Sequence, residues 1–251
     1  MSFTEHPRSL ARVAGAFYLM IIAFALFGYL YVRGQLIIPG DMAQTATNIT
    51  AREQLYRAGF TAAVVVVICN LPLGLILFEL LKVVNRRLAL LALLFIVVAA
   101  TIEAVNVFNY MTPLLTLTLP EYTSAFGPNE LQALARGANR LFGYGFSVSL
   151  TFFGVFCGLT GYLIVRSRFL PATIGILMVI AGLYYWINSF VLFLALPHIP
   201  DLFRWVTLVA ELALALWLLI VGVNEAEWRA QVQALQSGAA QRQRCGSMSK
   251  R

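Results

Sequence analysis

Six long apolar stretches constrain what this sequence can fold into. They cover residues 13–32, 60–81, 88–110, 141–165, 170–196 and 206–223. At about 1.5 Å per residue, each is long enough to cross a hydrocarbon layer of about 30 Å as a helix. Charged residues make up only 12% of the chain, against about 25% in soluble domains. The sequence therefore predicts an all-α, polytopic membrane bundle of six transmembrane helices and excludes a water-soluble globule.

The distribution of basic residues predicts the orientation of this bundle. With the N-terminus in the cytoplasm, twelve of the 18 Lys and Arg residues fall on the cytoplasmic side. The short loops 82–87 and 166–169 carry the clearest signal, because short cytoplasmic loops accumulate Lys and Arg. We therefore expect an N-in/C-in transmembrane domain over residues 1–223. A basic cytoplasmic tail over 224–251 should begin as a helix and become partly disordered.

Two segments on the outer side should form short helices. Pro39 and Gly40 precede Asp41, which is a suitable N-cap for a helix over residues 42–57. Pro128 and Asn129 precede a second short helix over residues 130–137. Neither segment is large enough to form a catalytic domain.

The formal net charge of +7 does not indicate a nucleic-acid partner. The basic residues lie in short clusters beside apolar stretches, which is typical of topology signals and of contact with a lipid bilayer. His6 and His198 are the only histidines and are far apart, so the sequence predicts neither a His-based metal site nor a haem cofactor. Common phosphate-binding and hydrolase motifs are also missing.

Three acidic residues lie inside the predicted spans. Glu79 is three residues from Lys82 at the cytoplasmic boundary, so an ion pair is expected there. Glu103 lies about 22 Å above the cytoplasmic edge, and Glu211 lies about 10 Å below the outer edge. These depths nearly coincide, and a carboxylate there costs at least about 2.5 kcal/mol. We therefore expect both groups to face the bundle interior, to be protonated, or to be paired.

Other polar residues could join these acids in one outward-facing pocket. Asn106 and Tyr110 share a helix face with Glu103, Tyr184 and Asn188 share a face in the span 170–196, and Asn70 lies two residues before Pro72. The ligand-binding candidates are therefore Glu103, Asn106, Tyr110, Glu211, Tyr184, Asn188 and Asn70. Two alternatives compete with a pocket: hydrogen bonds that hold the helices together, and ion pairs of the acids with Arg140 or Arg204.

The span 141–165 carries a continuous face of small residues. Its members are Gly143, Ser147, Thr151, Gly154, Gly158 and Gly161. Such a face lets another helix approach closely, either within the bundle or in a homo-oligomer.

These patterns support three hypotheses about function. The leading hypothesis is that the protein binds or transports a small polar, cationic or lipid-like ligand through Glu103 and Glu211. The alternative is a structural or sensor scaffold that assembles through the small-residue face. An enzyme is the least favoured hypothesis, because Ser189 is the only candidate nucleophile nearby and no histidine could activate it.

Several motifs resemble a known family. They include ARVAG at 11–15, VRGQLIIPGD at 32–41, LKVVNRRLALLA at 81–92, the stretch 143–154, GYLIVRSRFLP at 161–171 and NSF at 188–190. In this order they are similar to the bacterial membrane family named domain of unknown function 4386. The resemblance implies a six-helix protein of the bacterial inner membrane and no established activity.

Overall fold

Long apolar helices form most of the molecule. The computed structural model describes residues 6–195 and 202–248, with side chains for 6–195, 205–235 and 237. Every regular element in this described part is a helix, which confirms the predicted all-α class. Four helical stretches are long and apolar enough to cross a membrane: Pro7–Leu36, Glu53–Thr118, Pro128–Arg166 and Ala172–Phe193. The number of candidate spans rises to five if the helices Trp205–Ile220 and Glu225–Leu235 count as one bent span. These two helices meet at 94°.

The first of these stretches changes its winding partway along. It consists of α1 (Pro7–Ala25), a π-helical turn η1 (Leu26–Val32) and α2 (Arg33–Leu36). The short helix α3 (Met42–Ala51) follows, and the Asp41 side chain accepts a hydrogen bond from the backbone N–H of Gln44 at 2.9 Å. The predicted N-cap at Asp41 is therefore confirmed.

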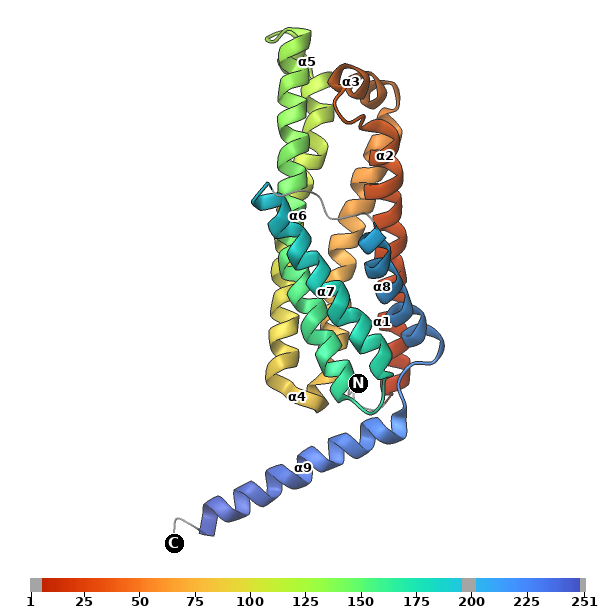
Figure 1. The fold of residues 1–251 in the computed structure, drawn as a ribbon, viewed down its shortest axis with the longest axis vertical. Helices are drawn as coiled ribbons and strands as arrows, with labels where there is room; N and C mark the ends of the chain where they lie inside the picture. The colour runs from red at the N-terminus through yellow and green to blue at the C-terminus, as the bar shows by residue number, and fades with distance from the viewer. Residues whose placement is uncertain (1–5, 196–201, 249–251) are drawn as a thin grey trace.

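The longest helix, α4 (Glu53–Thr118), contains two of the predicted spans. Its backbone leaves the helical conformation at Asn85, where φ is −155° and ψ is 106°. The chain folds back there, and the two arms pack side by side (Figure 1). Near their far ends the Tyr56 hydroxyl of one arm donates a hydrogen bond to the Tyr110 carbonyl of the other. The arms, residues 53–84 and 86–118, are therefore antiparallel.

The remaining helices complete the bundle. The short α5 (Pro120–Thr123) precedes α6 (Pro128–Arg166), which is followed by α7 (Ala172–Phe193) and α8 (Leu202–Ile220). The prediction of a separate short helix over residues 130–137 is wrong. Gly127 and Glu130 form the helix start, and nothing interrupts the helix afterwards, so this segment is the first part of α6.

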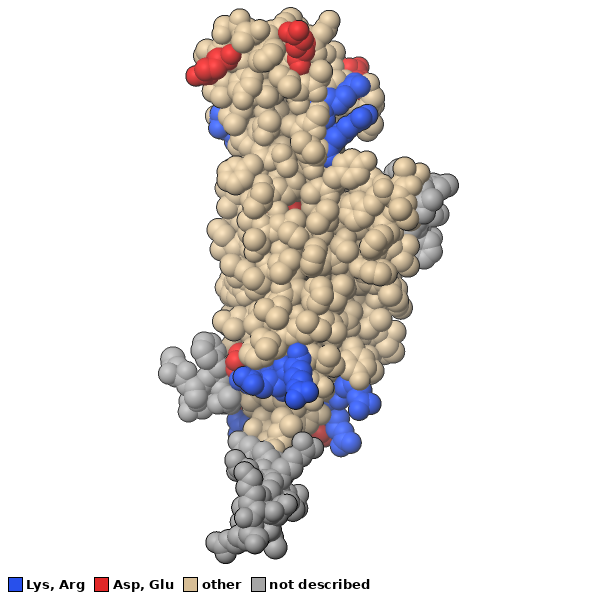
Figure 2. Space-filling model, turned by 90° about the vertical axis from the view of Figure 1, so that its left-hand side faces the viewer, with Lys and Arg blue, Asp and Glu red and all other residues tan. Residues whose placement is uncertain are grey.

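Charged residues gather near the two ends of the molecule. Figure 2 shows basic and acidic side chains at both ends and an almost entirely apolar surface between them. One small acidic patch is visible in this apolar middle. Such a band between two charged zones is the surface expected of a protein that spans a bilayer.

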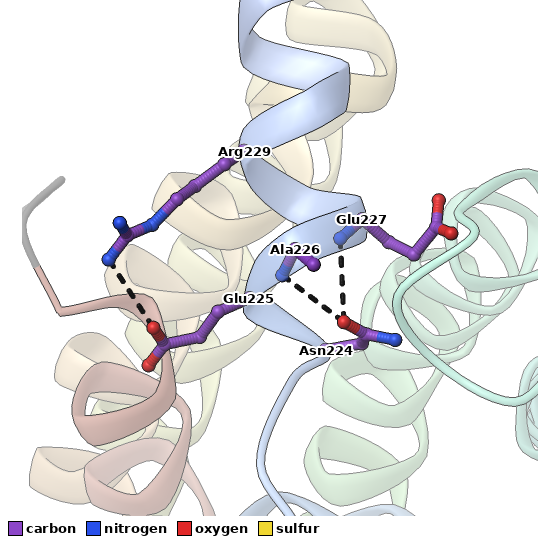
Figure 3. A network of polar contacts seen from close by, with 5 residues as sticks. All are labelled: Asn224, Glu225, Ala226, Glu227 and Arg229. Carbon is purple, nitrogen blue, oxygen red and sulfur yellow. Dashed lines mark hydrogen bonds and ion pairs between the residues drawn. The ribbon is translucent and has the colours of Figure 1, made fainter.

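The last helix, α9 (Glu225–Met248), leaves the bundle at the end where the N-terminus lies (Figure 1). The Asn224 side chain caps it by accepting hydrogen bonds from the backbone N–H groups of Ala226 and Glu227, and Glu225 pairs with Arg229 at 3.3 Å (Figure 3). The Trp228 indole N–H donates to the Leu80 carbonyl at 3.1 Å and fixes the first turn against α4.

Part of the predicted small-residue face packs within the chain. Gly154 and Gly161 of α6 lie against Gly182 and Gly175 of α7 at backbone contact distance. A Cβ on Gly161 would lie 2.5 Å from the Gly175 carbonyl oxygen, whereas a Cβ on Gly158 would meet nothing within 4 Å. This face therefore joins α6 to α7.

These two glycines provide a matched test of the α6–α7 contact. We expect Gly161→Ala to destabilise the protein by about 1–3 kcal/mol, because the added methyl group forces the two helices apart. Gly158→Ala should be neutral or stabilising by up to about 1 kcal/mol, because Ala favours helix and meets no clash. Thermal unfolding of the purified variants in detergent measures both effects. Equal melting temperatures for the two variants would contradict the packing.

Candidate functional site

A cavity of about 130 Å³ lies among the helices, and Glu103 and Glu211 line it. Its walls come from α1, η1, both arms of α4, α6, α7 and α8. The lining residues are Ile21, Ala25, Tyr29, Val66, Asn70, Ala99, Ala100, Glu103, Phe146, Ser149, Leu150, Phe153, Tyr185 and Glu211. Glu103 and Glu211, separated by more than a hundred positions in the sequence, therefore border the same space.

Glu103 is 5% exposed and is held by two neighbours. The Tyr29 hydroxyl donates to Glu103 Oε1 at 2.9 Å, and Asn106 Nδ2 lies 3.4 Å from Oε2. Asn106 Nδ2 also donates to the Phe142 carbonyl at 3.1 Å, which ties this arm of α4 to α6. Gly145 of α6 leaves the room for Asn106, because a Cβ there would collide with the amide group.

Glu211 is 8% exposed and is held from the other side of the cavity. The Tyr185 hydroxyl of α7 donates a hydrogen bond to Glu211 Oε1. The Tyr18 hydroxyl of α1 is also buried next to this carboxyl group, without a hydrogen bond of normal geometry. Because hydrogen bonds to charged groups contribute about 1.5–3 kcal/mol, the Tyr185 hydroxyl offsets part of the cost of burying the acid.

The polar lining of the cavity consists mainly of hydrogen-bond acceptors. Asn70 turns its Nδ2 to the Val66 carbonyl at 3.1 Å, and its Oδ1 is buried without a partner. Ser149 donates its hydroxyl proton to the Ala99 carbonyl at 2.9 Å. No Lys or Arg is among the lining residues in the described part of the chain. The cavity thus combines two carboxyl groups and an amide oxygen with no fixed cation.

The other predicted ligand-binding residues lie outside the cavity lining. Asn106 contacts the Glu103 carboxyl group but does not line the cavity. Tyr110 is buried in a neighbouring aromatic cluster, where its hydroxyl donates to the Gly28 carbonyl at 3.2 Å. Tyr184 and Asn188 are half-buried on α7 and do not line the cavity. On that helix it is Tyr185 that lines the cavity.

The competing ion pairs with the buried acids are not formed by the described side chains. The described ion pairs are Arg57–Glu53, Lys82–Glu79 and Arg229–Glu225. The second confirms the expected contact at Glu79. Arg140 is exposed and forms none of these pairs, and the Arg204 side chain lies outside the described residues.

The structure offers neither a metal site nor an activated serine in its described part. There, no group of three or more His, Cys, Asp and Glu side chains could hold a metal ion. Ser189, the candidate nucleophile, donates to the carbonyls of Ser147 and Tyr185 at 2.9 Å each and is buried away from the cavity.

Sequence analysis missed Tyr29, Tyr18 and Arg33 as functional candidates. Tyr29 and Arg33 are four residues apart and so share a helix face. Tyr29 lies in the predicted span 13–32 and Arg33 directly follows it, so their shared face is the one signal that the sequence offers. Tyr18 carries no comparable signal, because a lone aromatic residue in an apolar stretch is typical of any membrane helix.

Long apolar helices around a buried polar cavity are characteristic of a multi-pass membrane protein. The chain belongs to the family described as domain of unknown function DUF4386, whose profile matches residues 13–222. This match covers every residue that lines the cavity. Comparison with curated proteins gives no match. Comparison with solved structures gives none either.

The Tyr185–Glu211 contact leads to a direct prediction. Replacing Tyr185 by Phe removes the donor and leaves a buried carboxyl group unsatisfied, so the protein should lose about 1–3 kcal/mol of stability. The control is Tyr162→Phe, since the Tyr162 side chain is exposed. Thermal unfolding in detergent reports the difference. If both variants melt like the wild type, the hydrogen bond does not stabilise Glu211.

Proposed function

We propose that this protein binds a small cation in the cavity between Glu103 and Glu211 and transports it across the plasma (inner) membrane. The observation that carries the proposal is that two carboxyl groups from distant segments line one cavity without a basic residue. Burying two acids in an apolar bundle is costly, and intramembrane acids usually mark a path for ions or substrates. A bound cation would neutralise them.

The size of the cavity restricts the ligand. A cavity of about 130 Å³ is well below the 300–1,000 Å³ of pockets for drug-sized molecules. Since a dry cavity of about 150 Å³ holds benzene, a cation of roughly six heavy atoms or a partly hydrated metal ion is the upper limit. This favours a small cation over the lipid-like ligand that the sequence left open.

The apolar walls of the cavity restrict the chemistry of the ligand further. Phe146, Phe153, Tyr29 and Tyr185 all border the cavity. Aromatic faces attract organic cations, and alkyl groups gain from contact with apolar surface. An alkylammonium ion therefore fits this lining better than a bare metal ion, which needs more oxygen ligands than two carboxyl groups and one amide provide.

For the membrane topology we propose six spans with both termini in the cytoplasm. The break at Asn85 supports this count, because each arm of α4 is long enough to cross a bilayer. The basic residues at the α4 and α6–α7 turns, together with Arg8 and Arg12, favour a cytoplasmic location for that end of the bundle.

Cysteine labelling tests the topology. After replacing the three native cysteines, we expect Gln44→Cys to react with an impermeant maleimide on intact cells, because residue 44 is exposed on the outer side. Arg86→Cys and Ser237→Cys should react only after the cells are permeabilised. Labelling of Arg86→Cys in intact cells would contradict the six-span topology.

Ligand binding tests the function. Methylammonium should raise the melting temperature of the purified protein in a concentration-dependent way, while the bulkier tetraethylammonium should have little effect. Glu103→Gln and Glu211→Gln should each weaken methylammonium binding about 10- to 100-fold, the equivalent of one charged hydrogen bond.

The matched control is Glu79→Gln, which removes an acid paired with Lys82 outside the cavity and should leave binding unchanged. Uptake of radiolabelled methylammonium into proteoliposomes then separates transport from binding. If the folded Gln variants bind like the wild type, or if no small cation binds to the wild type, the proposal fails.

A further inference from the structure

We propose that Arg33 and Asn139 form a second site, which binds the phosphate group of an anionic ligand at the end of the bundle opposite α9. It is separate from the cavity, since neither residue is among those that line it. The evidence is two polar side chains with unpaired buried atoms, of which one stacks on the Phe142 ring and the other lies one turn before Phe142 on α6.

Arg33 carries a charge that no described group neutralises. Its Nη1 atom is buried without a hydrogen-bond partner, and no carboxylate among the described residues lies within 4 Å of it. Glu103, the acid that attracts it from a distance, already accepts hydrogen bonds from Tyr29 and Asn106. A guanidinium N–H group that is buried without a partner is costly in free energy, and an anion would satisfy it.

Aromatic rings hold the guanidinium group in place. Its Cζ atom lies 4.2 Å from the centre of the Phe142 ring and 5.3 Å from that of Tyr110. Stacking on rings fixes the plane of the guanidinium while leaving its N–H groups free at the edge. The donors are therefore preorganised for a planar or tetrahedral oxyanion.

Asn139 contributes a second unsatisfied group. Both Nδ2 and Oδ1 of its amide are buried without a partner. Seven buried side-chain atoms lack a partner in the described part of the chain, and Arg33 and Asn139 hold three of them. Both side chains are only half-buried as a whole, so the site borders the surface.

The packing register places the two residues at the same level of the bundle. Tyr29 contacts the rings of Phe146 and Phe142, at 4.9 and 6.0 Å between centroids. One turn further along its own helix, Arg33 contacts Phe142. Because this helix and α6 run antiparallel (Figure 1), the next position on α6, one turn before Phe142 on the same face, is Asn139.

The N–H donors of Arg33 and Asn139 and their depth in the membrane indicate a phosphate group as the ligand. An Arg fork and an Asn N–H group can contact three oxygens of one phosphate, and Arg is the preferred residue for this geometry. Arg33 also lies at the end of a membrane-spanning stretch, at the level expected for lipid headgroups. The phosphate could thus belong to a phospholipid headgroup or to a small free phosphate.

The test uses the full-length protein purified in detergent with lipid removed. One arm adds potassium phosphate, with potassium chloride at equal ionic strength as the reference. The other adds phosphatidylglycerol, with a phosphate-free galactolipid as the reference. Melting temperature and native mass spectrometry report binding in both arms.

Arg33→Lys keeps the positive charge but loses the planar set of guanidinium N–H donors, and Asn139→Leu removes the side-chain amide. We expect each to weaken phosphate or phospholipid binding at least tenfold. Arg52→Gln, at an exposed arginine of the same end, should bind like the wild type. A response to phosphatidylglycerol alone identifies a lipid headgroup, and a response to free phosphate identifies a soluble ligand.

Two results would overturn the proposal. One is a wild-type protein that responds to neither form of phosphate, a measurement that does not depend on any variant folding. The other is loss of binding in Arg52→Gln equal to that in Arg33→Lys, which would indicate unspecific attraction. Neither result bears on methylammonium binding, so this site and the cation site are tested independently.

Discussion

Two carboxyl groups in an apolar interior are the constraint on which the arrangement of this bundle depends. Each needs hydrogen-bond donors, because an isolated buried acid is costly. Tyr29 supplies one to Glu103, and Tyr185 supplies one to Glu211. The first bond joins η1 to α4 and the second joins α7 to α8, so satisfying the acids also fixes which helices are neighbours. The cavity lies where these two pairs of helices meet.

Sequence reasoning succeeded where one physical principle dominates. The apolar stretches define the helices because backbone groups in lipid must be satisfied within the helix. The Asp41 cap and the Glu79–Lys82 pair follow from spacing alone. The pairing of Glu103 with Glu211 in one cavity could be anticipated from their depth, since hydrocarbon excludes charge and both side chains should therefore face the bundle interior. The length of α6 could not be predicted, because a helix start at Gly127 does not determine where that helix ends.

The rest depends on rotation about helix axes, which composition does not determine. Tyr184 and Tyr185 are adjacent, and either could face inward in a helix that is apolar all round. Packing decides in favour of Tyr185, because Gly182 one turn earlier presses α7 against α6. Tyr29 and Arg33 were overlooked for a related reason. Aromatic and basic residues are common at the ends of membrane helices, and only the contacts with Phe142, Phe146 and Glu103 reveal that these two point inward.

The π-helical turn over Leu26–Val32 sets the phase between the two halves of the first span. A turn of this kind holds one more residue than an α-helical turn, and such bulges are frequent at functional sites. One residue corresponds to about 100° of rotation in an α-helix. In a regular α-helix Tyr18 and Tyr29 would lie within about 20° of each other, because eleven steps of about 100° nearly complete three turns. The π-helical turn winds more slowly than an α-helix, so it rotates Tyr29 off the face of Tyr18 and lets the two residues lie beside different acids.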